Sequence, residues 1–229
     1  VELPKLSDDP IRLYLSQMSE IPLFSRDEEI ALAKKIEITR KRFRRCLLGN
    51  AYALRQTVQI LSRVHSGELP FDRTIKVSLT ERLTKEQVTA RMPHNLTTLK
   101  ALMVKKRAIF MQIVRKSTST VERRELGKIY QRLREKCVTL AEELSLRSRR
   151  VIPNMKQLEE MADRMEALKM RIDILSLNPL QSGECERLQR EFRKLILQTE
   201  ESPRSLRNRC VSFRKHHNDF ESVKRELSQ

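Results

Sequence analysis

The chain has 229 residues, and its 47 Lys and Arg against 30 Asp and Glu give a formal net charge of +17. A surplus of this size attracts polyanions and repels other basic surfaces, so it favours nucleic acid, or a complex that contains it, as the partner. The other explanation is a solvated surface rich in Arg. With 4 Gly, no Trp and only 4% aromatic residues, the composition favours helices and argues against a large sheet.

The cysteines and the hydropathy pattern exclude several classes of protein. Cys46, Cys137, Cys185 and Cys210 are far apart, and no Cys/His spacing is typical of a zinc site. We therefore predict no metal, and reduced, mostly buried thiols. No apolar run reaches the roughly 18 residues of a membrane span, so no membrane partner is expected. Because there is no signal peptide and the chain begins at Val1 rather than Met, we expect a piece of a longer cytoplasmic protein.

The first predicted helix is short. The polar stretch 7–9 precedes Pro10, which fits the first position of a helix because its missing N–H costs nothing there. The helix extends to about Met18, and Ile11 and Leu15 share one face with Met18. Residues 21–23 are predicted to be extended, since Pro22 disfavours helix for the residue before it.

A capping box at Ser25 and Glu28 opens a long predicted helix that extends to about Leu48. Its far half is strongly basic and contains Arg40, Lys41, Arg42, Arg44 and Arg45. A helix over 51–64 and a loop over 65–74 follow, with Gly67 and Pro70 as helix breakers. A second capping box at 84–87 predicts a short helix that ends before Pro93, and Asn95 is predicted to cap a separate helix to about residue 116.

Three later segments have apolar residues at steps of three or four, which makes a narrow seam for a partner helix. The seam residues are Leu126, Ile129, Leu133, Cys137, Leu140 and Leu144; then Leu158, Met161, Met165, Leu168, Ile172 and Leu175; and then Leu206, Cys210, Phe213, His217 and Phe220. Ser119, Asn154 and Ser202 are the expected helix starts, and a shorter helix is expected over 184–200. Together the elements predict an all-α fold, an elongated helical bundle with coiled-coil-like helix pairs.

The sequence contains no motif that indicates catalysis. No glycine-rich phosphate loop, Gly-x-Ser-x-Gly or His-Glu-x-x-His motif occurs. Adjacent carboxylates such as Glu142 and Glu143 lie in predicted helices rich in Lys and Arg, where solvated helix charges explain them. The basic cluster at 147–150 is either a solvated loop or a contact to phosphate or to a protein partner. We predict no enzyme, no catalytic residue, no cofactor and no small-molecule substrate.

The stretch from Asp9 to Met18 (DPIRLYLSQM), followed by IPL at 21–23 and SRDEEIALAKKIE at 25–37, resembles the first conserved region of bacterial primary, housekeeping-type sigma factors. The segment 220–228 (FESVKRELS) resembles the Tyr-x-x-Ala-Lys-x-Glu-Leu sequence that leads into the central domain of that family. The two matches occur in the order found in the family. The resemblance implies the N-terminal part of such a factor.

The resemblance also implies a division of the chain. Residues 1–48 correspond to the conserved N-terminal sigma region, 49–201 to a variable helical insertion, and 202–229 to the first helix of a truncated central domain. In the family, the helices that bind core RNA polymerase and read the promoter come after this point. We therefore expect core polymerase to be bound mostly through parts outside this chain.

The family mechanism implies a set of DNA-binding residues. In sigma factors this first region lies near the non-template strand just downstream of the minus-ten element and helps to hold melted promoter DNA. The matching residues are Arg12, Tyr14, Leu15 and Met18. Arg12 is expected to bind phosphate or a base edge, and the other three to support an unstacked base. The alternative is that Ile11, Leu15 and Met18 are plain core residues.

The functional expectation is therefore a non-enzymatic, nucleoid-associated protein that directs RNA polymerase to promoters and supports open-complex formation. Two alternatives remain open. One is a helical protein-interaction scaffold, and the other is a free-standing basic nucleic-acid-binding protein. A free-standing binder would show salt-dependent affinity for DNA without polymerase.

Overall fold

The computed structural model describes residues 24–76, 84–177 and 181–227. Within these ranges the chain is all-helical, which confirms the predicted fold class, and one isolated antiparallel bridge joins Ile75 to Leu146. The helices, in chain order, are α2 (Arg26–Leu48), α3 (Ala51–His65), α4 (Phe71–Thr74), α5 (Lys85–Ile113), α6 (Thr120–Glu143), α7 (Ser148–Val151), α8 (Pro153–Leu175), α9 (Ser182–Thr199) and α10 (Pro203–Glu226).

Polar N-caps begin the long helices where the sequence predicted them. The side chains of Ser25, Thr84, Ser119 and Ser202 each accept a hydrogen bond from a backbone N–H of the first turn. The boxes at Ser25 and Thr84 are reciprocal, because the third helical residue binds back to the cap. Each cap stabilises its helix by about 1 kcal/mol, so these starts are encoded locally.

The predicted break at Pro93 is wrong, because α5 continues through it and Asn95 caps nothing. A stripe of buried apolar residues crosses the proline at helical spacing: Val88, Met92, Leu96 and Leu99. An interior proline costs about 3 kcal/mol, whereas burying one such side chain contributes about 1.5–3 kcal/mol. Packing of the stripe therefore outweighs the proline. The Asn95 amide instead donates to Glu143 Oε2 at 2.9 Å, which ties α5 to α6.

Two smaller predictions also differ from the structure. Asn154 is not a cap, since α8 begins at Pro153 and Asn154 is buried in the first turn. Proline at the first helical position fixes the helix start there without a side-chain cap. The predicted loop 65–74 contains the single helical turn α4, which follows Pro70.

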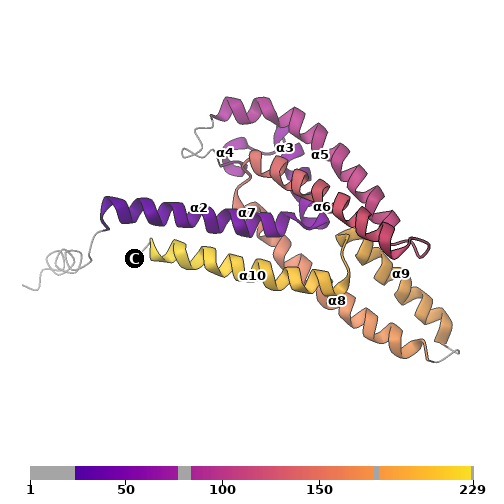
Figure 1. The fold of residues 1–229 in the computed structure, drawn as a ribbon. Coiled ribbons are helices and arrows are strands. Elements are labelled where there is room, and N and C mark those ends of the chain that lie inside the picture. The colour runs from indigo at the N-terminus through magenta and orange to yellow at the C-terminus, as the bar shows by residue number, and fades with distance from the viewer. Residues whose placement is uncertain (1–23, 77–83, 178–180, 228–229) are drawn as a thin grey trace, which may run out of the picture.

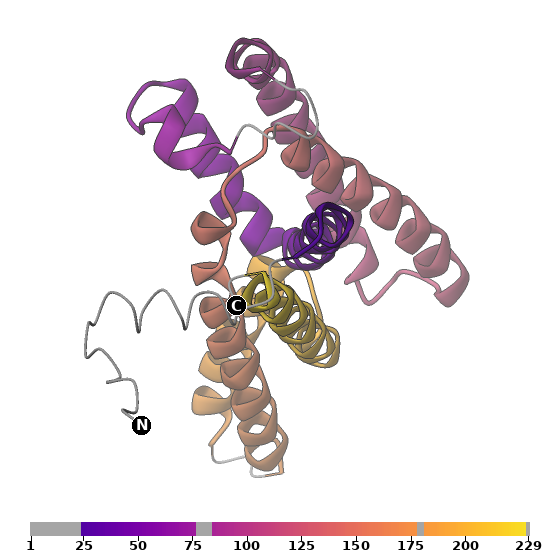
Figure 2. The same ribbon diagram turned by 90° about the vertical axis from the view of Figure 1, so that its left-hand side faces the viewer.

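Three helix pairs extend from a shared centre (Figure 1). They are α2 with α10, α5 with α6, and α8 with α9, and α8 also packs against α10. Figure 2 views the molecule along the α2/α10 pair, with the other two pairs on opposite sides of it. The central α3 touches α2, α5, α6, α7, α8 and α9 and buries one face, so it unites the pairs around one hydrophobic core.

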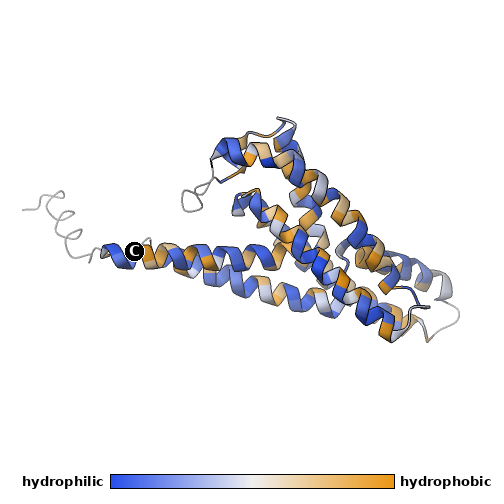
Figure 3. Cartoon of the chain, turned by 45° about the horizontal axis from the view of Figure 1, so that its top comes forward, coloured by the Kyte–Doolittle hydropathy of each residue, from blue (hydrophilic) through white to orange (hydrophobic). Residues whose placement is uncertain are grey.

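Most of the predicted seam residues form this core. Leu133 and Cys137 are buried in α6, and Leu144 is buried just after it. Leu206, Cys210, Phe213 and Phe220 are buried in α10, but Ile129 is 40% exposed. Three of the four cysteines are buried, as predicted. Polar and apolar residues interleave along the helices (Figure 3). Among the helices described, none combines the length and the apolar character that crossing a membrane requires.

Candidate nucleic-acid interface

The predicted DNA-binding residues Arg12, Tyr14, Leu15 and Met18 lie outside the described residues. The structure therefore neither brings them together nor separates them. What it does describe is α2, the helix that follows them, and the surfaces that α2 shares with α6 and α10. These surfaces form the candidate interface.

The two ends of α2 have opposite charge. Its first turn contains Asp27, Glu28 and Glu29. The Ser25 backbone N–H donates to Glu28 Oε2 at 2.8 Å, and this hydrogen bond, with a second one from the Ser25 hydroxyl, lowers the pKa of that carboxyl. The far half contains the basic run 40–45. A polyanion would therefore be attracted to the C-terminal half of α2 rather than to its start.

Pairing with α10 holds α2 in a straight, antiparallel contact. The His217 ring packs edge-on against Phe43 with centroids 5.1 Å apart. Arg209 Nη1 donates to the Cys46 carbonyl at 3.0 Å, close to Gly49, where an added Cβ would lie only 2.8 Å from that guanidinium. Segments near the two ends of the chain are thus side by side, and the basic run of α2 lies next to the centre of the molecule.

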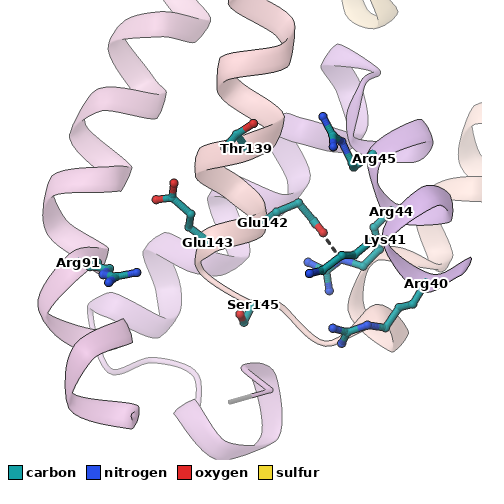
Figure 4. Close-up of a pocket in the computed structure, with 9 residues that line it drawn as sticks. All are labelled: Arg40, Lys41, Arg44, Arg45, Arg91, Thr139, Glu142, Glu143 and Ser145. Carbon is teal, nitrogen blue, oxygen red and sulfur yellow. Dashed lines mark hydrogen bonds and ion pairs between the residues drawn. The ribbon is translucent and has the colours of Figure 1, made fainter. Parts of the chain in front are cut away.

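The basic run lines a pocket of about 380 Å³ between α2 and α6 (Figure 4). Its lining residues are Arg40, Lys41, Arg44 and Arg45 from α2, Arg91 from α5, and Thr139, Glu142, Glu143 and Ser145 from α6 and the residues after it. Cations outnumber carboxylates in this lining. Both carboxylates already have partners, because Glu142 binds Arg44 and Glu143 accepts from Asn95.

Arg44 is the buried centre of this pocket. Its Nε donates to Glu142 Oε1 at 2.8 Å, and Nη1 donates to the Leu146 carbonyl. Its Nη2 and the nearby Arg40 Nε are buried donors that have no hydrogen-bond partner within the described ranges. Buried guanidinium donors next to a cationic pocket suit an oxyanion such as a phosphate, which accepts charge-assisted hydrogen bonds. Glu142 is consequently a partner of buried Arg44 and not the solvated helix charge that the sequence suggested.

The basic cluster at 147–150 has a structural role that neither sequence-based alternative included. Arg147 donates to the carbonyls of Asp72 and Ile75 at 2.8 and 3.1 Å, and Arg149 Nη2 donates to the Arg73 carbonyl at 2.8 Å. These guanidinium groups therefore satisfy the carbonyls at the end of the short helix α4. They are engaged with backbone and are poor candidates for a phosphate contact.

A buried ionic network surrounds Glu200, and no sequence pattern indicated it. Lys106 Nζ lies 2.7 Å from Glu200 Oε2, and the Tyr130 hydroxyl donates to the same oxygen at 3.0 Å. Arg55 and Arg107 approach the other oxygen at 3.8 and 3.9 Å. Burial, together with the charge of Glu200, raises the pKa of Tyr130, so the phenol remains a donor. This network joins α3, α5 and α6 to the turn after α9.

The described residues thus define a cationic, all-helical protein with a basic pocket on the helix that follows its predicted DNA contacts. The family model described as "Sigma-70 factor, region 1.2" matches residues 9–41, which end inside the basic run of α2. The chain is also 25% identical over 68 residues to the RNA polymerase sigma factor RpoD of Neisseria gonorrhoeae. The aligned part is 30% of this chain and only 11% of that relative. The family model thus covers a short stretch near the start of the chain, and the aligned region is a small part of the relative's length.

Proposed function

We propose that this chain is the N-terminal part of a bacterial primary sigma factor, which directs RNA polymerase to promoters and supports open-complex formation. The observation that carries the proposal is the match of residues 9–41 to region 1.2 of sigma-70 factors. The protein would act without catalysis of its own, in the bacterial cytoplasm and at the nucleoid, as a subunit of the polymerase holoenzyme. Its three segments would be the conserved region 1–48, the insertion 49–201 and the start of the central domain at 202–229.

The proposed DNA contact is made by the segment before α2 to the non-template strand, just downstream of the minus-ten element. Arg12 would bind a phosphate or a base edge there. Tyr14, Leu15 and Met18 would support an unstacked base, because ring faces and apolar side chains stabilise bases that have left the duplex. Holding such a base slows reclosure of the melted DNA.

The geometry of α2 is consistent with this role. Helix α2 pairs with α10 from about Lys35, which binds Glu226 at the end of α10, and the exposed first turns of α2 extend beyond this pair toward the segment that precedes them (Figure 1). The basic pocket around Arg44 lies farther along the same helix, so it could hold a phosphate of the same DNA. The acidic first turn, which separates the two, would repel the backbone and limit contact to these two places.

We expect Arg12→Ala and Leu15→Ala each to shorten the lifetime of the open complex by about tenfold, since one specific contact contributes about 1–3 kcal/mol. The measurement is the decay of competitor-resistant complexes formed by core RNA polymerase and the sigma factor that contains this chain. The effect should depend on the non-template bases just downstream of the minus-ten element. Arg132→Ala, an exposed arginine on α6, is the matched control. Lifetimes equal to that of the control would show that the assigned contacts are wrong.

A further inference from the structure

Helix α9 has two distinct faces. One face is apolar and packs inward with Cys185, Phe192 and Ile196. The other face is a stripe at helical spacing, formed by Arg190, Arg193, Lys194, Leu197 and Gln198. These five residues follow the i, i+3, i+4, i+7, i+8 pattern, so they lie in one row along the helix. Three of the five, Arg190, Arg193 and Lys194, are exposed cations, so the face that turns away from the core is basic.

Two arginines from other helices form the opposite wall of a groove along this row. Arg55 of α3 donates to the Gln198 carbonyl, and Arg107 Nη1 of α5 donates to the Leu197 carbonyl at 2.9 Å. These hydrogen bonds fix both guanidinium groups at the C-terminal end of α9. Burial lowers the pKa of Arg55, and Glu200 opposes this effect. The groove has a volume of about 610 Å³.

Among the residues that the structure describes, no carboxylate lines this groove, and those nearby are already engaged. Glu200 is buried and holds Lys106 at 2.7 Å, while Arg55 and Arg107 lie nearly 4 Å away. Glu191 binds Arg164 through two hydrogen bonds of 2.7 and 2.8 Å. Glu186 reaches Arg190 only at 3.8 Å, with both side chains mostly exposed, and such a pair contributes little. The groove thus has a large excess of positive charge.

We propose that this groove binds the phosphate backbone of duplex DNA, independently of sequence. Rows of Arg and Lys neutralise phosphates and release counterions, which supplies most of the free energy of non-specific binding. Single-strand binding would need aromatic side chains for stacking, and the groove lining contains none. The contact is separate from the proposed contact at 9–18; it rests on the proposed function only in that promoter DNA would supply the duplex.

The test is binding of the 229-residue chain to a duplex of random sequence, measured by fluorescence anisotropy at salt concentrations from about 50 to 200 mM. The variant is Arg190→Gln, Arg193→Gln and Lys194→Gln together. These side chains are exposed, so the thermal melt should match that of the parent. We expect at least tenfold weaker binding at low salt. The slope of log K against log salt should become shallower by up to about 2.7, because each of the three lost phosphate contacts removes about 0.9.

The matched control is Arg132→Gln, Lys136→Gln and Arg204→Gln, which removes the same charge from exposed positions on α6 and α10. Equal losses in the two variants would show a net-charge effect and overturn the proposal. Undetectable DNA binding by the parent chain would do the same. Polyglutamate that competes as well as duplex would assign the groove to an acidic protein. Single-stranded DNA that binds as tightly as duplex would refute the choice of duplex. None of these results depends on Arg12, so they leave the proposed function to its own test.

Discussion

Glu200→Gln is expected to lower the free energy of unfolding by about 3–5 kcal/mol, because removing one partner of a buried ion pair leaves the other charge uncompensated. The stranded partner is Lys106, which is 1% exposed and lies 2.7 Å from the Glu200 carboxylate. Gln has nearly the same shape as Glu, so the loss of stability comes from the removed charge and not from altered packing. For a chain of this size the melting temperature should fall by about 10 °C.

Circular dichroism melting and urea titration measure this loss. The matched control is Glu191→Gln, which breaks the exposed pair with Arg164 and should change stability by less than about 1 kcal/mol. Adding Lys106→Met to Glu200→Gln should restore much of the stability, since the buried charge is then gone. A Glu200→Gln variant that melts like the Glu191→Gln control would mean that the ionic network around Glu200 does not stabilise the fold.

Leu133→Asp is expected to unfold the α5/α6 pair, with a loss of about 3 kcal/mol or more, because it replaces a buried apolar side chain with a carboxylate that has no partner. Leu133 is 8% exposed on α6, which packs along α5. The measurement is hydrogen exchange of the α5 and α6 amides together with a thermal melt.

Ile129→Asp is a sharp control for that experiment. Ile129 lies one turn before Leu133 in the same predicted seam, yet it is 40% exposed. A carboxylate there stays hydrated, so the loss should be at most about 1 kcal/mol. Equal melting curves for the two variants would show that Leu133 does not belong to the core.

Local signals predicted most of the fold. The caps at Ser25, Thr84, Ser119 and Ser202 depend on neighbouring residues alone, and the structure confirms each of them. The prediction of a helix break at Pro93 was wrong because packing against other helices outweighs the cost of the proline. The stripe on both sides of the proline is stabilised only by the helices that cover it, and one sequence does not show which those are.

The environment of a charge was the least predictable property. Arg44 belongs to a run of basic residues that looks solvated, yet it is buried against Glu142 and the Leu146 carbonyl. In the sequence, nothing distinguishes Glu200 from other glutamates near a helix end. In the structure, its backbone is left-handed and its carboxylate is enclosed. Both depend on partners distant in the sequence, and a pattern of charges alone cannot reveal such pairings.

The DNA contacts and the segment boundaries stay predictions. Residues 9–18 are known here by their sequence and by the family match, and α2 is the described element that links them to the core. The core contains residues from all three predicted segments, for example Phe43, Leu99 and Phe213. The described parts of the three predicted segments are therefore packed together. The functions proposed for them are tested by separate variants.

We propose that the segment before α2 touches strand-separated promoter DNA inside the holoenzyme, and the proposed role in open-complex formation depends on this contact. The most direct measurement places a photo-crosslinking amino acid at Tyr14 and, as a control, at the 84% exposed Leu177. Open complexes are then irradiated, and the crosslinked bases are mapped. Crosslinks from position 14 to non-template bases just downstream of the minus-ten element, absent from position 177, are the predicted result. Crosslinks from position 14 to polymerase subunits alone, with no DNA product, would contradict it.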